Sequence, residues 1–153
     1  ETQPLHQEGV RIRHVGRQNR MSSDLRDAIS DSVELTKEND SLTLSVAFDY
    51  GGRSDILDAV RGIIADGVAL EKITEDLFQR YLNTSELPDP DLIIRTAGEM
   101  RLSNFMLWQS AYAEYYSTAV YWPDFNESEV DKALSTYGRR QRRYGKLDAE
   151  GLI

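Results

Sequence analysis

The chain contains no cysteine among its 153 residues, and this absence removes several kinds of chemistry. Without a thiol there is no disulfide, no thiolate nucleophile and no cysteine-bound metal, and a reducing cytoplasm suits such a composition. The sequence also lacks an apolar run long enough to cross a bilayer, and its first ten residues lack the plan of a signal peptide. No Walker loop, Gly-x-Gly-x-x-Gly turn or Ser-His-Asp arrangement can be read.

Net positive charge is also lacking, because 26 acidic residues outnumber 18 lysines and arginines and give a formal net charge of −8. Such a chain repels a phosphate backbone, so we expect no nucleic-acid partner. The exception is a basic cluster near the C-terminus, from Arg139 to Lys146. It suits a solvated helix end, where cations complement the macrodipole, and equally a contact with an anion or an acidic membrane.

What is present is an alternation of strand and helix patterns within a length typical of one domain, residues 1–153. This alternation predicts an α/β fold with a mostly parallel central sheet flanked by helices. The first nine residues look like the end of a helix that stops at Gly9. We expect strands at residues 10–16, 42–50, 92–96 and 119–122, and helices at 22–39, 52–67, 74–82, 105–116 and 127–143. The strand at 42–50 is expected to be buried, Ser22 to cap the helix at 22–39, and Leu57 and Ile64 to point inward from the helix at 52–67.

Two expected strands end in residues that suit an anion, and ligands of α/β sheets bind at such carboxyl ends. The first is Gly51–Gly52, which precedes a helix and allows close backbone approach, although it could equally be a simple turn with Asp55 complementing the helix dipole. The second is Arg95, followed by Arg101 and Ser103. Guanidinium forks bind phosphate oxygens, which favours an anion site, but Arg95 could instead form an ion pair with Glu99.

A single carboxylate, Glu114, follows these arginines in an aromatic-rich stretch that we expect to be helical. Magnesium prefers one or two carboxylates together with substrate phosphates, so Glu114 is a candidate metal ligand. The alternative is an ordinary acid on the helix surface. The aromatic residues around it are typical of a core or a dimer interface.

The run DLIIRTAGEMRLSNFMLWQSAYAEYY, together with VYWPDF and GRRQRRYG, resembles the C-terminal part of the cis-prenyltransferases. SVAFDYGGRSDI and VRIRHVG resemble two further motifs of this family. The resemblance implies a homodimeric transferase that condenses isopentenyl diphosphate onto an allylic diphosphate, forming cis-polyisoprenyl diphosphate with Mg²⁺ as cofactor. The absence of cysteine favours a cytoplasmic protein, and the basic cluster leaves peripheral contact at the inner face of the membrane as a further option.

The resemblance assigns roles to individual residues. It implies that six residues hold the diphosphate of isopentenyl diphosphate. It also implies that Glu114 reaches a magnesium ion at the partner subunit's site. The Arg-x-Gly at Arg143–Gly145 would cross the dimer. The implied substrate-binding residues are Arg95, Arg101, Leu102, Ser103, Arg143 and Gly145.

Two departures from the family pattern limit what the chain can do. The family's Asp-Gly-Asn-Gly-Arg-Trp loop, which carries the catalytic aspartate, does not occur in this sequence. We therefore assign no catalytic residue within the chain and expect it to be a fragment, inactive alone. The alternative is a non-catalytic subunit of a heteromeric cis-prenyltransferase. Met100 stands where several relatives carry histidine, and a thioether is a poor magnesium ligand.

Overall fold

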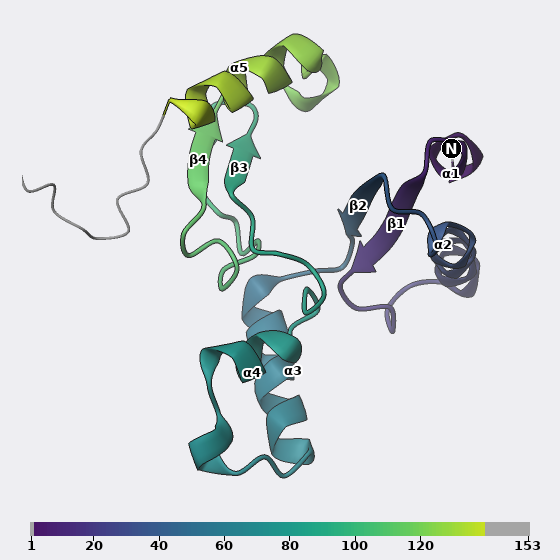
Figure 1. Ribbon diagram of the computed structural model, residues 1–153, viewed down its shortest axis with the longest axis vertical. Helices are drawn as coiled ribbons and strands as arrows, with labels where there is room; N and C mark the ends of the chain where they lie inside the picture. Colours follow the sequence, from purple (N-terminus) through teal and green to yellow (C-terminus); the bar gives the residue numbers. More distant parts are fainter. Residues whose placement is uncertain (1, 140–153) are drawn as a thin grey trace, which may run out of the picture. The chain divides into compact units, whose positions relative to one another are not determined.

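The structure is a computed structural model that describes residues 2–139 (Figure 1). The chain divides into two compact units, residues 1–87 and residues 88–153, and each is described separately. Each unit contains one pair of parallel strands, with helices before, between or after them. The predicted α/β class with parallel strands is therefore confirmed.

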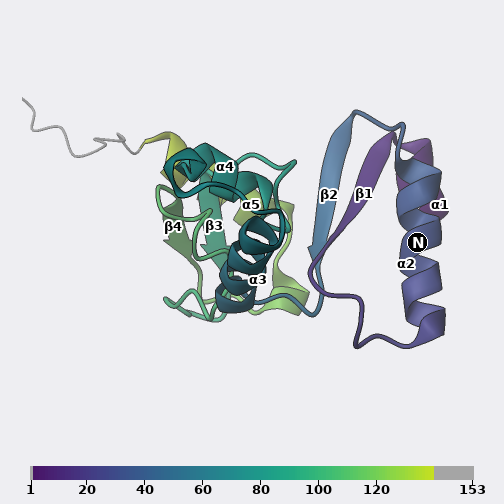
Figure 2. The ribbon, with the colours of Figure 1, turned by 90° about the horizontal axis from the view of Figure 1, so that it is seen from below.

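The first unit begins with a helix, two parallel strands and a crossover helix. β1 pairs with β2 in parallel along their full lengths, and α2 runs along one face of this pair (Figure 2). Thr36, at the end of α2, is fully buried and its hydroxyl accepts a hydrogen bond of 2.9 Å from the backbone of Ile12. The elements are α1 (Thr2–Gln7), β1 (Val10–Val15), α2 (Ser23–Thr36) and β2 (Leu42–Ala47).

The helix ends of this unit follow the capping chemistry expected from the sequence. Gly9 has φ +75°, and its N–H bonds to the His6 carbonyl just after α1. Ser22 caps α2 by accepting a hydrogen bond from the backbone of Leu25. Both predictions are confirmed, because a left-handed glycine and a serine N-cap satisfy backbone groups that the helix itself leaves unpaired.

The prediction that residues 42–50 form a buried strand is wrong in two respects. β2 ends at Ala47, and all six of its residues are exposed. Leu44 and Val46 face a cavity beside α2 rather than a packed core, so their apolar character does not translate into burial. An apolar run of this length has the same sequence pattern whether the strand is buried in a packed core or lines a cavity.

The second half of the first unit is a helical hairpin made of α3 (Gly52–Ala65), a short 3₁₀ helix (Leu70–Lys72) and α4 (Glu75–Arg80). Gly67, at φ +63°, ends α3 as predicted, with its N–H bonded to Ile64 and the next N–H bonded to Ile63. Tyr81 packs against Gly62 so closely that a methyl group there would lie 2.9 Å from the ring.

The face of α3 that packs inward differs from the prediction. Ala59 and Ile63 are buried, but Leu57 and Ile64, which we expected to point inward, are 53% and 72% exposed. The apolar residues of α3 spread over one wide arc of the helix, so periodicity alone could not decide which part of that arc would be covered.

Asp55 connects the start of α3 to the loop after α4. This carboxylate is only 3% exposed and accepts hydrogen bonds from the Tyr50 hydroxyl at 3.0 Å and from the backbone and side-chain nitrogens of Asn83 at 2.9 and 2.7 Å. The expected first-turn acid is thus a buried acceptor that joins segments 28 positions apart.

We therefore expect Asp55→Ala to destabilise the protein by about 2–4 kcal/mol, because three hydrogen bonds to a buried charged group are lost. Urea unfolding monitored by circular dichroism measures this change. Asp66→Ala is the matched control, since Asp66 accepts one exposed hydrogen bond from Tyr81 and its loss should cost less than about 1 kcal/mol. Equal effects of the two substitutions would contradict the assignment of Asp55.

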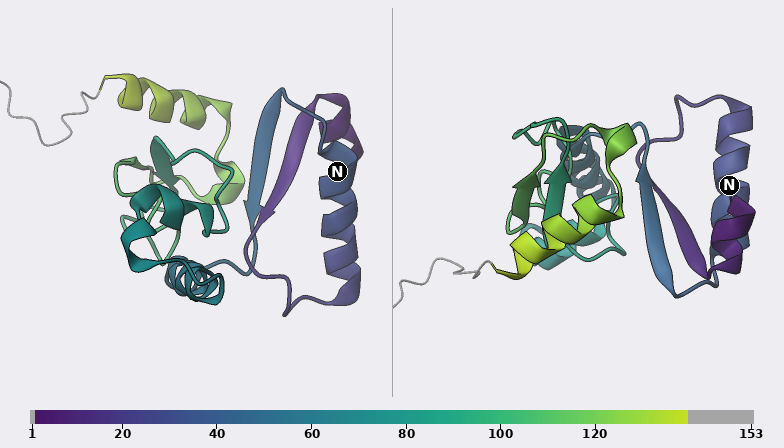
Figure 3. Two further views of the ribbon diagram at one scale, coloured as in Figure 1. Left: turned by 60° about the horizontal axis from the view of Figure 1, so that its bottom comes forward. Right: turned by 90° about the horizontal axis from the view of Figure 1, so that it is seen from above.

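The second unit contains the parallel pair β3 (Leu92–Arg95) and β4 (Glu114–Ser117), followed by a 3₁₀ helix (Trp122–Asp124) and α5 (Glu127–Gly138), which contacts β4 (Figure 3). Their register pairs Leu92 with Glu114 and Arg95 with Ser117. The two carboxyl ends therefore lie together, and the long connection between the strands returns to the other end.

The prediction of a helix over residues 105–116 is wrong, and so is the strand over 119–122. The chain makes successive turns up to Ala113 and then enters β4, where Tyr115 and Tyr116 pair with Ile93 and Ile94. Aromatic residues favour strands as well as helix interiors, so the apolar pattern was ambiguous. Residues 122–124, which include Pro123, form a 3₁₀ helix instead of extending a strand.

Among residues 2–139, no helix combines the length and the apolar character needed to span a bilayer. The predicted C-terminal helix begins where expected, after the N-cap Asn126, whose side chain accepts a hydrogen bond from Glu129. It is described to Gly138, and the remainder of the prediction, residues 140–143, lies outside the described residues.

Candidate functional site

The candidate anion site is built on the turn that follows β3. Arg95 is the last residue of the strand and is half-buried. Ala97 and Gly98 then adopt left-handed conformations, with φ of 59° and 67°, and reverse the chain. Their N–H groups donate to the carbonyls of Val120 and Thr118, both at 2.8 Å. The turn is therefore held against the segment that follows β4.

The residues after this turn continue in an unusual backbone conformation. Ser103, Asn104 and Met106 all have positive φ, at 51°, 62° and 46°. Left-handed conformations are unfavourable for residues with a Cβ and cost of order 1 kcal/mol or more each. Several of them in one loop occur where the surrounding structure requires a particular backbone path, and such loops are common at binding sites.

Two opposite charges in this loop, those of Arg101 and Glu99, lie next to each other. Arg101 and Glu99 form an ion pair of 2.5 Å, and the Arg101 side chain is 69% exposed. The expected partner of Arg95, Glu99, thus pairs with Arg101. Exposed ion pairs contribute at most about 1 kcal/mol, so an incoming anion could replace Glu99 at small cost.

Arg95, Arg101 and Ser103 lie in one segment that begins at the carboxyl end of β3. Leu102 lies between them and is half-buried. The prediction that this segment precedes a helix N-terminus is wrong, since turns follow it. Arg143 and Gly145 lie outside the described residues, and Met100 is 76% exposed.

Glu114 occupies a different place from the one predicted. It is the first residue of β4 rather than part of a helix, and its register partner is Leu92. Arg95 pairs three positions further along, which corresponds to about 10 Å at the usual rise of a strand. Within this unit, therefore, Glu114 and Arg95 lie at opposite ends of the strand pair.

Few side chains in the described part of the chain are placed to bind a metal ion together. Among residues 2–139 there is no group of three or more acidic or histidine side chains able to hold a metal ion. Magnesium needs only one or two carboxylates when substrate phosphates complete its shell, so a single Glu114 is compatible with this mode of binding. It is not compatible with a metal held by protein ligands alone.

A second cluster of charges, at the carboxyl ends of β1 and β2, was missed by sequence reasoning. Arg17 donates twice to Asp58, at 2.6 and 2.9 Å, and Arg20 pairs with Asp49. Asp49 has φ 52° and follows β2 close to Gly16, where an added Cβ would lie 2.3 Å from a backbone oxygen. The two arginines directly after the first strand were the signal that could have revealed this cluster.

This cluster makes the stability of the protein sensitive to acid. Hydrogen bonds from Arg20 and Arg17 lower the pKa values of Asp49 and Asp58, respectively, below their ordinary value of 3.8. A lowered folded-state pKa contributes stability above the unfolded pKa, and that contribution disappears as pH falls through the folded pKa.

We expect the urea midpoint of the wild-type protein to fall more steeply below about pH 4 than that of Asp58→Asn, because the variant has already lost one of these groups. Asp131→Asn, which changes an exposed acid on α5, is the control and should follow the wild type. Parallel curves for wild type and Asp58→Asn would contradict this account.

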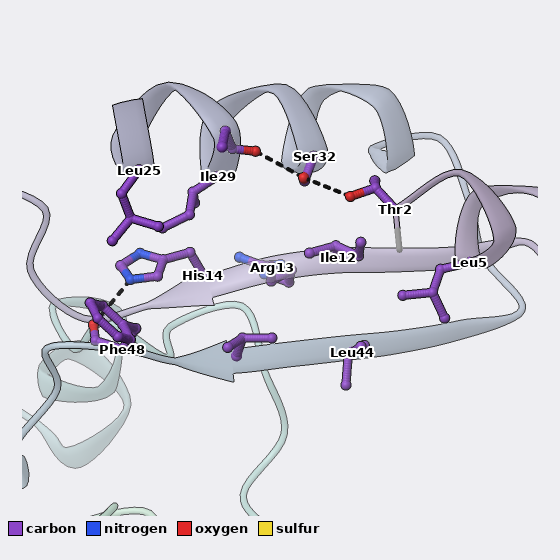
Figure 4. A pocket seen from close by; sticks show the side chains of 12 residues that line it. Thr2, Leu5, Ile12, Arg13, His14, Leu25, Ile29, Ser32, Leu44 and Phe48 are labelled. Atoms are coloured by element: carbon purple, nitrogen blue, oxygen red, sulfur yellow. Dashed lines mark hydrogen bonds between the residues drawn. The ribbon is translucent and has the colours of Figure 1, made fainter. Parts of the chain in front are cut away.

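The first unit also contains an apolar cavity of about 360 Å³ between α2 and the β1–β2 pair (Figure 4). The His14 ring lies at one end beside Phe48, and its Nε2–H donates to the Phe48 carbonyl at 3.1 Å, so no free N–H points into the cavity from that nitrogen. The residues that line the cavity include Ile12, His14, Leu25, Ile29, Leu44 and Phe48.

Comparison with known proteins identifies the class to which this fold and these motifs belong. Residues 1–145 match the model of the undecaprenyl diphosphate synthase family of prenyltransferases. An isoprenyl transferase of Fusobacterium nucleatum is 52% identical over 136 residues, covering 89% of this chain and 58% of the relative. One from Streptococcus pyogenes serotype M6 is 48% identical over 151 residues, covering 94% of this chain and 61% of the relative.

Among solved structures, lavandulyl diphosphate synthase from Lavandula x intermedia, in complex with dimethylallyl diphosphate, superimposes with a TM-score of 0.91. It is 38% identical, and the match covers 95% of this chain and 65% of that one. The chain belongs to the undecaprenyl diphosphate synthase family, the cis-prenyltransferases. It spans about three fifths of the length of the curated relatives that it matches.

Proposed function

We propose that the protein to which this chain belongs condenses isopentenyl diphosphate onto an allylic diphosphate and forms a cis-polyisoprenyl diphosphate. The observation that carries the proposal is the segment that begins at the carboxyl end of β3 and contains Arg95, Arg101 and Ser103 in a chain of this family. The complex of a 38% identical relative with dimethylallyl diphosphate supports an allylic diphosphate as one substrate.

The arginines would hold the diphosphate of isopentenyl diphosphate. Arg95 is half-buried, so a bound diphosphate would exchange water for a partly desolvated guanidinium, which strengthens the interaction. Arg101 would exchange Glu99 for a phosphate oxygen. The Ser103 hydroxyl would add a donor, while Leu102 would contribute backbone contacts. Arg143 and Gly145 would complete the set, as the family resemblance implies.

Glu114 would supply a carboxylate to Mg²⁺ at the partner subunit's site in a homodimer. The place of Glu114 at the opposite end of the strands from Arg95 supports a role in a site other than the one its own Arg95 occupies. Magnesium, when bound, neutralises charge that develops on the departing diphosphate. The residues of this chain orient the accepting substrate so that its double bond can attack the allylic carbon.

The cavity between α2 and the strands would take part of the hydrocarbon chain. Its wall is apolar, and burial of hydrocarbon contributes about 0.8 kcal/mol per CH₂. Such a wall contacts every isoprene unit in the same way, which suits a product that grows by repetition. We propose a cytoplasmic enzyme, with contact at the inner face of the membrane where the product would be released.

The test is a condensation assay with labelled isopentenyl diphosphate, an allylic diphosphate and Mg²⁺, run in parallel on residues 1–153 and on the full protein. We expect transfer with the full protein and none with residues 1–153 alone, because no catalytic residue is assigned within them. Full activity of residues 1–153 would contradict the fragment proposal. Activity that appears only after a second protein is added would favour the non-catalytic subunit instead.

A further inference from the structure

A nearly buried carboxylate on α5 is not accounted for by the roles described above. Glu129 is 9% exposed, and one of its oxygens accepts a hydrogen bond of 3.1 Å from the buried hydroxyl of Thr118. Its other oxygen accepts from the Lys132 ammonium at 2.5 Å, and this hydrogen bond lowers the pKa of Glu129. The carboxylate is therefore ionised at neutral pH and acts as an acceptor.

The position of Glu129 in its helix makes this contact unexpected. Asn126 is the N-cap of α5, so Glu129 is the third helical residue. A glutamate at that position usually returns to the N–H of the capping residue and completes a capping box. Here its carboxylate is directed instead to Thr118, which lies just beyond the carboxyl end of β4.

Thr118 in turn contacts both sides of the arginine-bearing turn. Its N–H donates to the Arg95 carbonyl at 2.9 Å, and its own carbonyl accepts from Gly98 at 2.8 Å. Its hydroxyl accepts from the N–H of Val120, whose carbonyl receives the N–H of Ala97. The backbone of Thr118 thus contacts the turn at both ends, and its hydroxyl binds Val120, whose carbonyl holds Ala97.

Ser117 adds a further connection by donating from its hydroxyl to the Glu99 carbonyl at 3.0 Å. The left-handed backbone of Ala97 is strained, and such strain persists only where neighbouring contacts determine the path of the chain. The hydrogen bonds from residues 117–120 supply those contacts. Removing one of them would allow the turn to relax and would shift the guanidinium of Arg95.

We propose that Glu129 and Thr118 are positioning residues that hold the turn after β3, and with it Arg95, in the geometry that binds isopentenyl diphosphate. The inference rests on the proposed function of Arg95. Neither residue needs to touch the substrate, because the Glu129 carboxylate acts on Thr118, and Thr118 acts on the backbone of Arg95 and Gly98.

The experiment measures KM for each substrate in the full protein with Thr118→Val, which keeps the shape of the side chain and removes the hydroxyl. We expect a rise of about tenfold in KM for isopentenyl diphosphate and less than a twofold change in KM for the allylic diphosphate. Thr118→Ser restores the hydroxyl and should return KM to within about twofold of the wild type.

Thr136→Val is the matched control, since it removes a hydroxyl from α5 that donates only to the Lys132 carbonyl in the same helix. It should leave both KM values unchanged. Glu129→Leu should reproduce the effect of Thr118→Val, and the double variant should add little to either, because both substitutions break the same contact. An equal change in both KM values, or a change shared by Thr136→Val, would overturn the proposal.

Arg95→Ala separates this proposal from the function on which it rests. If Arg95→Ala raises KM for isopentenyl diphosphate but Thr118→Val and Glu129→Leu do not, the positioning role is wrong and the binding site stands. If Arg95→Ala also leaves that KM unchanged, the proposed function of the loop is wrong.

Discussion

Arg95→Ala in the full protein is expected to raise KM for isopentenyl diphosphate by between about tenfold and about 150-fold, since a hydrogen-bonded charged group contributes about 1.5–3 kcal/mol. The guanidinium is half-buried at the carboxyl end of β3, where water competes less well for a bound diphosphate. The expected loss falls on one substrate, so KM for the allylic diphosphate should change little. Steady-state kinetics with each substrate varied in turn measures this difference.

Arg26→Ala is the control for removing a positive charge. Arg26 is exposed on α2, in the other unit from Arg95. This substitution tests whether the loss of any one positive charge weakens the long-range attraction between the protein and its anionic substrate. That attraction depends on salt concentration. Equal KM values for wild type and Arg95→Ala, or equal effects of Arg95→Ala and Arg26→Ala, would contradict the assigned role.

Glu114→Gln is expected to lower kcat/KM by about 100-fold or more and to raise the magnesium concentration needed for half-maximal activity. The substitution keeps the shape of the side chain but removes its negative charge, and a neutral amide oxygen is a weaker magnesium ligand than a carboxylate. A 100-fold loss corresponds to about 2.7 kcal/mol of transition-state stabilisation. Substrate titrations repeated over a series of magnesium concentrations measure both effects.

Glu127→Gln provides the comparison, because Glu127 is an exposed acid in the first turn of α5 of the same unit. It should retain the wild-type response to magnesium. A normal magnesium response in Glu114→Gln would show that Glu114 is an ordinary strand residue. It would leave the proposed diphosphate contacts of Arg95 untouched, because the two residues lie at opposite ends of the strand pair.

Helix ends were the part of the fold most accessible from sequence. Gly9, Gly67 and Ser22 each act within a few residues of their own position, and each performs the expected role. Local hydrogen bonds decide these positions, so neighbouring residues contain the necessary information. The strands beginning at Val10 and Leu92 were found for a similar reason, since short β-rich runs between turn residues leave few alternatives.

The segment from Phe105 to Tyr116 shows where sequence reasoning failed. Its apolar residues fit a helix, yet the chain turns repeatedly and Tyr115 enters a strand beside Ile93. Strand pairing depends on a partner more than twenty positions earlier, which a local pattern does not reveal. Asn104 was an available warning, because asparagine tolerates the left-handed conformation that it adopts here.

In the candidate site too, features set by local sequence could be predicted, and features set by tertiary packing could not. Arg95, Arg101 and Ser103 could be placed together because they lie close in sequence and follow a strand. The buried contact from Glu129 to Thr118 spans eleven positions and depends on how α5 packs against β4, so it required the structure. Glu114 was expected in a helix, and its place at the start of β4 depends on pairing with Leu92, so this position also required the structure.

The central claim is that the full protein joins isopentenyl diphosphate to an allylic diphosphate with cis geometry. The most direct measurement is the geometry of the newly formed double bonds, determined by nuclear magnetic resonance on product made from carbon-labelled isopentenyl diphosphate. We predict cis double bonds in every added unit, formed only when Mg²⁺ is present. Trans double bonds, or no carbon transfer from isopentenyl diphosphate under these conditions, would contradict the account.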